Sequence, residues 1–186
     1  EIVRCLLEMD ADANLANCND NTPLWVASWK RHFEVVRSLL KSKANHRKVN
    51  HNVESALWVA SEHGHLKVVQ LLIDAEAHVD TCDYNNTSPL WVASWKGHRE
   101  VVDLLLQSMA NQHLMDKVFG ATPLWVASKH GHVDVVRFLL KAHGDQNKAN
   151  RENLSPLVVA AYWGHLNVLG VLLMSWLRSS CWGVKR

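Results

Sequence analysis

The sequence lacks the features that mark disulfide-stapled, membrane-spanning or strongly charged proteins. Its four cysteines are far apart and form no CxxC pair, which excludes a disulfide framework and indicates reduced thiols. The longest apolar run, near residues 168–177, is too short for a membrane span and is interrupted by polar residues. The formal net charge of +2 is too small to indicate nucleic-acid binding by itself. We therefore expect an intracellular protein without a membrane span, in the cytoplasm or, as an open alternative, the nucleus.

Sequence motifs that carry chemistry are also missing. The chain contains no GxxxxGK[ST], GxGxxG, HExxH or GxSxG motif. Its twelve histidines include two HxH pairs, at 63/65 and 130/132, but no carboxylate or cysteine completes a metal site around them. We therefore expect no enzymatic activity, cofactor, metal ion or small-molecule substrate.

What the sequence does contain is a repeat of about 33 residues. Five copies are in register, from TPLWVASWKRHFEVVRSLL through SPLWVASWKGHREVVDLLL to SPLVVAAYWGHLNVLGVLL. Spacings of 33, 33, 34 and 33 residues separate their anchor leucines, Leu24, Leu57, Leu90, Leu124 and Leu157. Five histidines also share one repeat position and are expected to be structural, namely His32, His65, His98, His132 and His165.

Each copy predicts two short helices. Ser or Thr followed by Pro is typical of a helix N-cap with proline at the first helical position, as at Ser88-Pro89. Gly97-His98 should end the first helix, and residues 100–106 should form a second helix with one apolar stripe. The polar residues between copies should form a loop or an extended hairpin. Because one unit cannot bury its apolar stripes alone, the copies are expected to stack into an elongated solenoid.

The pattern TPLW…GHxEVVxLLL resembles the ankyrin repeat, whose motif reads TPLHLAA, then GH, then an apolar second helix. The resemblance implies an all-α, curved ankyrin-repeat solenoid and covers roughly residues 1–174. We expect a single domain over 1–186, with a partial repeat at 1–16 that begins inside a second helix. Complete repeats are predicted at 17–49, 50–82, 83–116 and 117–149, the last repeat's helices at 150–178, and a disordered tail at 179–186.

Two departures from the family pattern carry predictions. The glycine that normally follows the second helix, where φ is positive, is replaced at Asp10, Lys43, Glu76, Met109 and His143. Val53 likewise replaces a loop glycine, so the solenoid should be less stable than a consensus one. Tryptophan also replaces the TPLH histidine, and we interpret this series as a structural ladder that keeps one N–H donor, comprising Trp25, Trp58, Trp91 and Trp125.

The resemblance also implies where a partner binds, since the family uses the concave face of its first helices and its hairpin tips. The residue pairs that end the first helices vary and hold several large aromatics beside cations, a composition typical of binding hot spots. The candidate partner-binding residues are Trp29, Lys30, His63, Trp95, Lys96, Lys129, His130, Tyr162 and Trp163, together with Phe119 at a hairpin tip. An alternative is that the aromatic rings lie flat on neighbouring helices and that Phe119 tucks under its loop.

The function predicted from the sequence is a non-catalytic scaffold or adaptor that binds another protein. One alternative is that the chain is the targeting arm of a larger enzyme or channel whose active domain lies outside this region. A further alternative is polyanion or nucleic-acid binding through the basic residues of 41–48 and Lys185-Arg186. The acidic linker that follows, with Asp74, Glu76, Asp80 and Asp83, argues against that last alternative.

Overall fold

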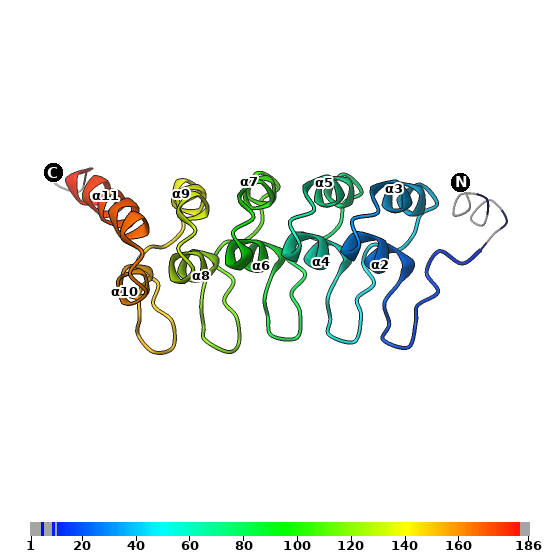
Figure 1. Ribbon diagram of the computed structural model, residues 1–186, viewed down its shortest axis with the longest axis horizontal. Coiled ribbons are helices and arrows are strands. Elements are labelled where there is room, and N and C mark those ends of the chain that lie inside the picture. The colour runs from blue at the N-terminus through cyan, green and yellow to red at the C-terminus, as the bar shows by residue number, and fades with distance from the viewer. Residues whose placement is uncertain (1–4, 6–8, 10, 183–186) are drawn as a thin grey trace.

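The protein is an elongated stack of helix pairs with loops projecting from one side (Figure 1). The computed structural model describes residues 5, 9 and 11–182, and the backbone alone over 179–182. The first helices form an inner row, comprising α2 (Pro23–Trp29), α4 (Ala56–Glu62), α6 (Pro89–Lys96), α8 (Pro123–Lys129) and α10 (Pro156–Tyr162). The second helices form a row beside them, comprising α3 (Phe33–Lys41), α5 (Leu66–Asp74), α7 (Arg99–Gln107), α9 (Val133–Lys141) and α11 (Leu166–Trp182).

The first helices begin where the Ser/Thr-Pro pattern predicts. In α6, the Ser88 side-chain oxygen accepts a hydrogen bond from the Trp91 amide at 3.1 Å, and Pro89 follows as the first helical residue. The same cap recurs in the other first helices, although α4 begins with Ala56 in place of proline. The capping oxygen satisfies an amide that the helix itself cannot pair, and so fixes where each first helix starts.

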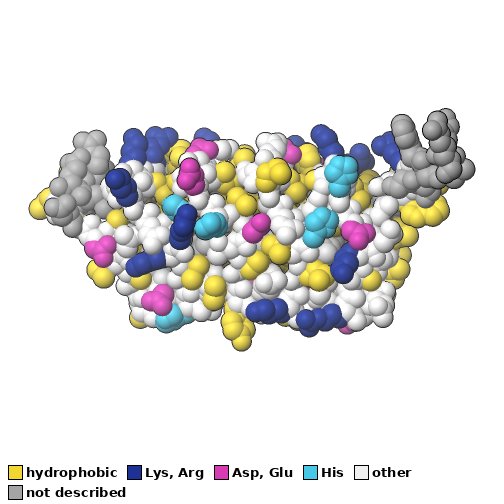
Figure 2. Space-filling model, turned by 180° about the vertical axis from the view of Figure 1, so that it is seen from behind, with side chains coloured by type: hydrophobic (Ala, Val, Ile, Leu, Met, Phe, Trp, Pro, Cys, Tyr) yellow, Lys and Arg dark blue, Asp and Glu magenta, His cyan; other side chains and the backbone are white. Residues whose placement is uncertain are grey.

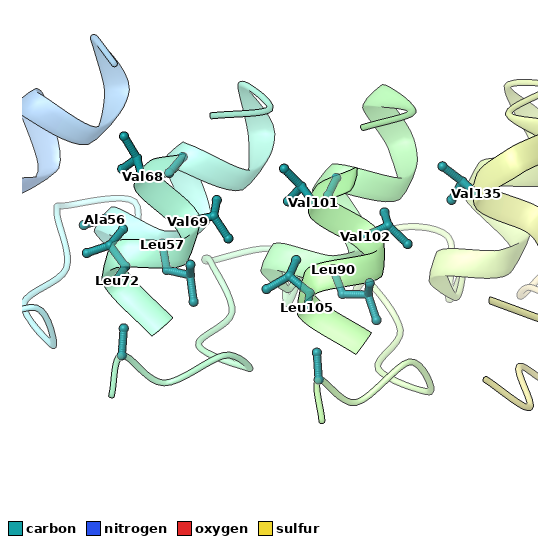
Figure 3. Packing of buried hydrophobic residues seen from close by; sticks show 14 of the residues in the cluster. Ala56, Leu57, Val68, Val69, Leu72, Leu90, Val101, Val102, Leu105 and Val135 are labelled. Carbon is teal, nitrogen blue, oxygen red and sulfur yellow. The ribbon is translucent and has the colours of Figure 1, made fainter. Parts of the chain in front are cut away.

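One hydrophobic core runs along the stack between the two rows of helices. Figure 3 shows Leu57, Val69 and Leu72 in one repeat and their counterparts Leu90, Val102 and Leu105 in the next, in the same arrangement. Small alanines at 27, 60, 93, 127 and 160 lie buried in this core, which lets the short helices approach closely. The expected all-α repeat solenoid is therefore confirmed.

The loops between repeats project side by side and contain no regular β-strand in the described part of the chain. One isolated bridge joins Val49 and Ser55. Backbone hydrogen bonds connect each tip to the next, including Tyr84 N to Asn52 O at 3.0 Å and Lys117 N to Asn85 O at 2.8 Å. These bonds hold neighbouring tips in a fixed relation to one another.

The positive φ angles expected after the second helices are present at Lys43, Glu76, Met109 and His143, with values of 58–68°. This geometry lets the next amide bond back to the helix, as Ala110 N does to Leu105 O at 3.0 Å. Val53 also has a positive φ of 63°, as expected. Arg31 adds a strained position that the sequence pattern did not reveal, with a φ of 61° at the glycine position of the GH motif.

Replacing Met109 by glycine is expected to stabilise the protein by about 0.5–1 kcal/mol, because the Cβ strain at positive φ is removed. Met109 is 86% exposed, so the substitution removes almost no packing. Urea unfolding followed by circular dichroism measures the change. Met109→Ala is the matched control, since alanine keeps the Cβ and should leave the midpoint unchanged; equal midpoints for the glycine and alanine variants would contradict the strain argument.

The structure bears differently on the expectations for the two ends of the chain. Most of the half-repeat expected at 1–16 precedes residue 11 and lies outside the described residues. At the other end, α11 continues to Trp182, so residues 179–182 are helical and the tail expected to be disordered from 179 does not begin there. No glycine or proline follows Gly170 before Gly183, so nothing in the sequence stops the helix after the repeat pattern ends. Residues 183–186 lie outside the described residues.

Candidate functional site

The candidate site lies where the first helices end, and for α2, α4, α6 and α8 a histidine of the next repeat holds this end in place. His65 Nε2 lies 3.0 Å from Trp29 O, and His98 Nε2 lies 2.9 Å from Glu62 O. His132 and His165 make the same contact with Trp95 O and Lys129 O, each at 2.9 Å. A carbonyl oxygen only accepts, so Nε2 carries the proton in each ring and donates it. These GH histidines are therefore structural, as expected, and they fix the backbone that carries the candidate binding residues.

The tryptophan ladder joins the first helices to the following loops. Indole Nε1 atoms of Trp58, Trp91 and Trp125 donate to Thr87 O, Ala121 O and Leu154 O at 2.9, 2.9 and 2.8 Å. Trp25 is buried, but its Nε1 has no hydrogen-bond partner among the described residues. These contacts give three of the four tryptophans the structural, donating role expected from the sequence.

Lysine ammonium groups lie over aromatic rings at the ends of the first helices. Lys30 Nζ is 3.6 Å from the centroid of the Trp29 ring, and Lys96 Nζ is 3.7 Å from that of Trp95. Trp29 remains 38% exposed and Trp95 is half-buried. An ammonium group over an indole face is attracted by the ring quadrupole, which orders both groups before a partner arrives.

Contacts between repeats link these pairs into one row along the stack. Trp29 Nε1 donates to His63 Nε2 at 3.2 Å, while His63 Nδ1 donates to Val59 O at 3.0 Å, so both ring nitrogens of His63 are hydrogen-bonded. Glu62 Oε1 lies 3.8 Å from Lys96 Nζ, which joins the second repeat to the third. Trp95 meets His130 edge-on with ring centroids 6.4 Å apart, which joins the third repeat to the fourth.

The remaining candidates lie beside this row or at its end. Phe119 is exposed on its loop tip, and Lys129 Nζ is 5.2 Å from its ring centroid and 5.6 Å from that of Trp125. Tyr162 and Trp163 pack edge-on against each other at 5.7 Å and are strongly exposed. We define the aromatic–lysine row as Trp29, Lys30, Glu62, His63, Trp95, Lys96, Lys129, His130, Tyr162 and Trp163.

Two features of this face were not predicted from the sequence. Tyr84 is a second exposed aromatic on a loop tip, with Lys117 Nζ 5.7 Å from its ring centroid. Its exposed position could have been inferred from its place in the polar linker between copies. The pairing of Glu62 with Lys96 joins residues 34 positions apart and becomes visible only in the folded stack.

Two histidines in or beside the row have lowered pKa values. Burial lowers the pKa of His130 from its ordinary value of 6.5, and the positive charge of Lys129 and the neighbouring His132, His165 and Lys96 lower it further. Burial also lowers the pKa of His65, opposed by the hydrogen bond to Trp29 O. Both rings therefore favour the uncharged form in the folded protein.

Acidification is expected to destabilise the fold through these two rings. Their pKa values are lower in the folded than in the unfolded chain, so their contribution to stability is complete above about pH 6.5 and is lost as the pH falls through the lowered values. Urea midpoints measured from about pH 7.5 to about pH 5 should fall, and His130→Gln should flatten this dependence. The same slope in parent and variant would exclude His130 as a contributor.

Features of other classes of site are not seen in the part of the chain that the structure describes. No group of three or more His, Cys, Asp or Glu side chains could hold a metal ion there. None of the described helices has the length and apolarity needed to cross a membrane.

Stacked helix pairs with capped first helices, GH histidines and connecting loops define a repeat protein that presents an extended surface. The sequence profile described as Ankyrin repeats (3 copies) matches residues 1–52, 42–116 and 108–179. The chain therefore belongs to the ankyrin repeat family, whose repeats are general protein–protein interaction modules and are typically non-catalytic. A comparison with curated proteins gave no match.

Proposed function

We propose that this chain is an intracellular, non-catalytic scaffold that binds another protein through the aromatic–lysine row and the neighbouring tip residue Phe119. The observation that carries the proposal is the repeated placement of a lysine over a partly exposed tryptophan, at Trp29–Lys30 and Trp95–Lys96. Aromatic side chains beside cations are enriched in binding hot spots, because they bury a large area and lose little conformational freedom.

The rigidity of the row supports the same function. The ends of α2, α4, α6 and α8 are each held by a histidine from the next repeat, and Trp29, His63, Lys96 and His130 contact residues of adjacent repeats. A surface ordered in advance loses less conformational entropy on binding. Figure 2 shows basic, acidic and histidine side chains interspersed with hydrophobic ones along one face, a pattern that favours docking of a specific protein over uniform polyanion binding.

The test is affinity capture from a cell extract with the parent chain and the variant Trp29→Ala/Trp95→Ala/Trp163→Ala. A matched control, Arg37→Ala/Gln70→Ala/Gln107→Ala, changes three exposed residues of the second helices. Circular dichroism and urea midpoints establish that the compared proteins are folded.

Loss of a specific captured protein by the tryptophan variant alone is the expected result. Equal capture by all three proteins would exclude the aromatic–lysine row as the binding surface, and the tip variant Phe119→Ala would then be tested. Capture that collapses as salt is raised and includes nucleic acid would contradict protein docking in favour of polyanion binding.

A further inference from the structure

A groove of about 810 Å³ opens between α9 and α11 at the C-terminal end of the stack. Figure 1 shows these two helices side by side in the row of second helices, on the side of the molecule opposite the loop tips. The groove is lined by second-helix residues alone, so none of the candidate partner-binding residues contributes to it. It is a second surface, independent of the aromatic–lysine row.

Gly170 lines this groove and places no side chain in it, whereas the earlier repeats carry a polar or charged side chain at the equivalent position. The equivalent positions in the earlier repeats are Arg37, Gln70, Asp103 and Arg137. A Cβ added at Gly170 would meet no heavy atom within 4 Å, so the position borders open space. The groove that α5, α7 and α9 form, lined by Asp103, Leu104 and Phe138 among others, has only about 300 Å³.

The chemistry of the lining is also specific to this end. Its floor is apolar, with Leu140, Leu166, Val171 and Met174, and the exposed residues among these leave unburied hydrophobic surface. Its charged residues are all cations: Arg137, Lys141 and Arg178. No ion pair neutralises any of these three cations within the residues that the structure describes. The smaller groove differs, because Arg99 there is paired with Glu100 at 2.8 Å.

We propose that the groove between α9 and α11 binds an acidic amphipathic helix of another protein. An apolar side chain of that helix would lie over Gly170, and carboxylates on either side of it would meet Arg137, Lys141 and Arg178. A helix fits a groove formed by two helices, because its ridges pack between theirs and its apolar residues recur on one face. Unpaired cations around an apolar floor select against basic partners and attract acidic ones.

The experiment uses the complete chain and a displayed library of helical peptides of about 14 residues, roughly four turns. The peptides carry a fixed leucine stripe and random residues at the flanking positions. The library is selected on the parent protein alone, and the selected peptides are then measured on Gly170→Gln, which restores the side chain found at position 70 and narrows the groove. Gly170→Ala is the control, since it leaves the groove open and favours the helix.

The expected outcome is enrichment of Asp and Glu at the flanking positions. A selected peptide should bind Gly170→Ala like the parent, and should bind Gly170→Gln or Arg137→Glu/Arg178→Glu at least about tenfold more weakly. The variant Trp29→Ala/Trp95→Ala/Trp163→Ala should bind it unchanged, which separates this proposal from the function proposed for the row.

Three results would overturn the proposal. Peptides without acidic enrichment, or peptides that bind Gly170→Gln as tightly as the parent, would exclude an acidic helix in this groove. If the parent chain dimerises and Gly170→Gln abolishes the dimer, the groove binds a second copy of this chain instead. If no peptide is selected, and the parent chain sediments with phosphatidylserine vesicles while Gly170→Gln does not, the groove binds a membrane surface instead.

Discussion

Replacing Trp125 by alanine is expected to destabilise the protein by about 4 kcal/mol, the largest effect that we predict for a single side chain. The Trp125 indole is 4% exposed and packs with Ala121, Val126 and Val159. Its Nε1 donates to Leu154 O at 2.8 Å, so the substitution opens a cavity and also leaves that carbonyl without its donor. Equilibrium unfolding in urea, followed by circular dichroism, measures the loss.

Two controls separate packing from hydrogen bonding at this position. Trp125→Phe keeps most of the apolar contact and removes the donor, so it should cost only about 1–2 kcal/mol. Val158, which occupies the same position in the last repeat, is 46% exposed, and Val158→Ala should cost less than about 1 kcal/mol. A loss below about 1 kcal/mol for Trp125→Ala would show that the tryptophan ladder does not join the repeats.

Replacing Gly97 by alanine is expected to cost about 2–3 kcal/mol. Gly97 has a φ of 78°, and a Cβ at this position would lie 2.6 Å from His132 Nδ1. The ring cannot move away freely, because His132 Nε2 is bonded to Trp95 O at 2.9 Å. The cost combines the backbone strain, about 1 kcal/mol, with the displacement of a packed and hydrogen-bonded ring. Arg31 occupies the same repeat position with a Cβ and a φ of 61°, which shows that the fold accommodates a side chain there. We therefore expect Gly97→Ala to cause local repacking and not loss of the fold.

Gly164→Ala is the matched control for Gly97→Ala. Gly164 has a similar φ of 74°, but a Cβ there would meet nothing within 4 Å, so only the strain of about 1 kcal/mol remains. The difference between the two urea-unfolding free energies isolates the clash with the histidine of the next repeat. Equal losses of unfolding free energy in the two variants would show that the His132 ring moves aside without an energetic cost.

The regular part of the fold could be predicted from the sequence because each repeat contains the same capping and turn residues at the same positions. Thr122-Pro123 and its counterparts specify where the first helices begin, and the positive φ at Lys43, Met109 and His143 follows from their positions after the second helices. The indole N–H of Trp58 could be expected to keep a donor's role, although its acceptor, Thr87 O, lies in the next loop.

Features that depart from the repeat could not be predicted in the same way. The strain at Arg31 was missed because the first copy reads KRH, with arginine at the position where the other four copies have the glycine of GH. The length of α11 was missed because the repeat pattern ends near Leu173, whereas helix continuation depends on local propensity and not on the pattern.

Within the candidate site, the sequence identified the residues but not their geometry. Adjacent residues inside a helix do not face each other, so nothing predicts that Lys96 covers Trp95. Lys96 is the final residue of α6, and at this helix end its side chain can turn back over the Trp95 ring. Contacts such as Trp29 to His63 join residues 34 positions apart and depend on the stacking of repeats.

The histidines that hold the ends of α2, α4, α6 and α8 are supplied 36 or 37 residues later in the chain. During synthesis, Trp29 and Glu62 therefore leave the ribosome well before the residues that hold their backbone carbonyls. At about 5–20 residues per second, this delay lasts about 2–7 s. A partner that meets the nascent chain would thus find the parts of the aromatic–lysine row at the ends of α2, α4, α6 and α8 in their final geometry only after the following repeat has emerged, so this surface matures in order from the N-terminal side.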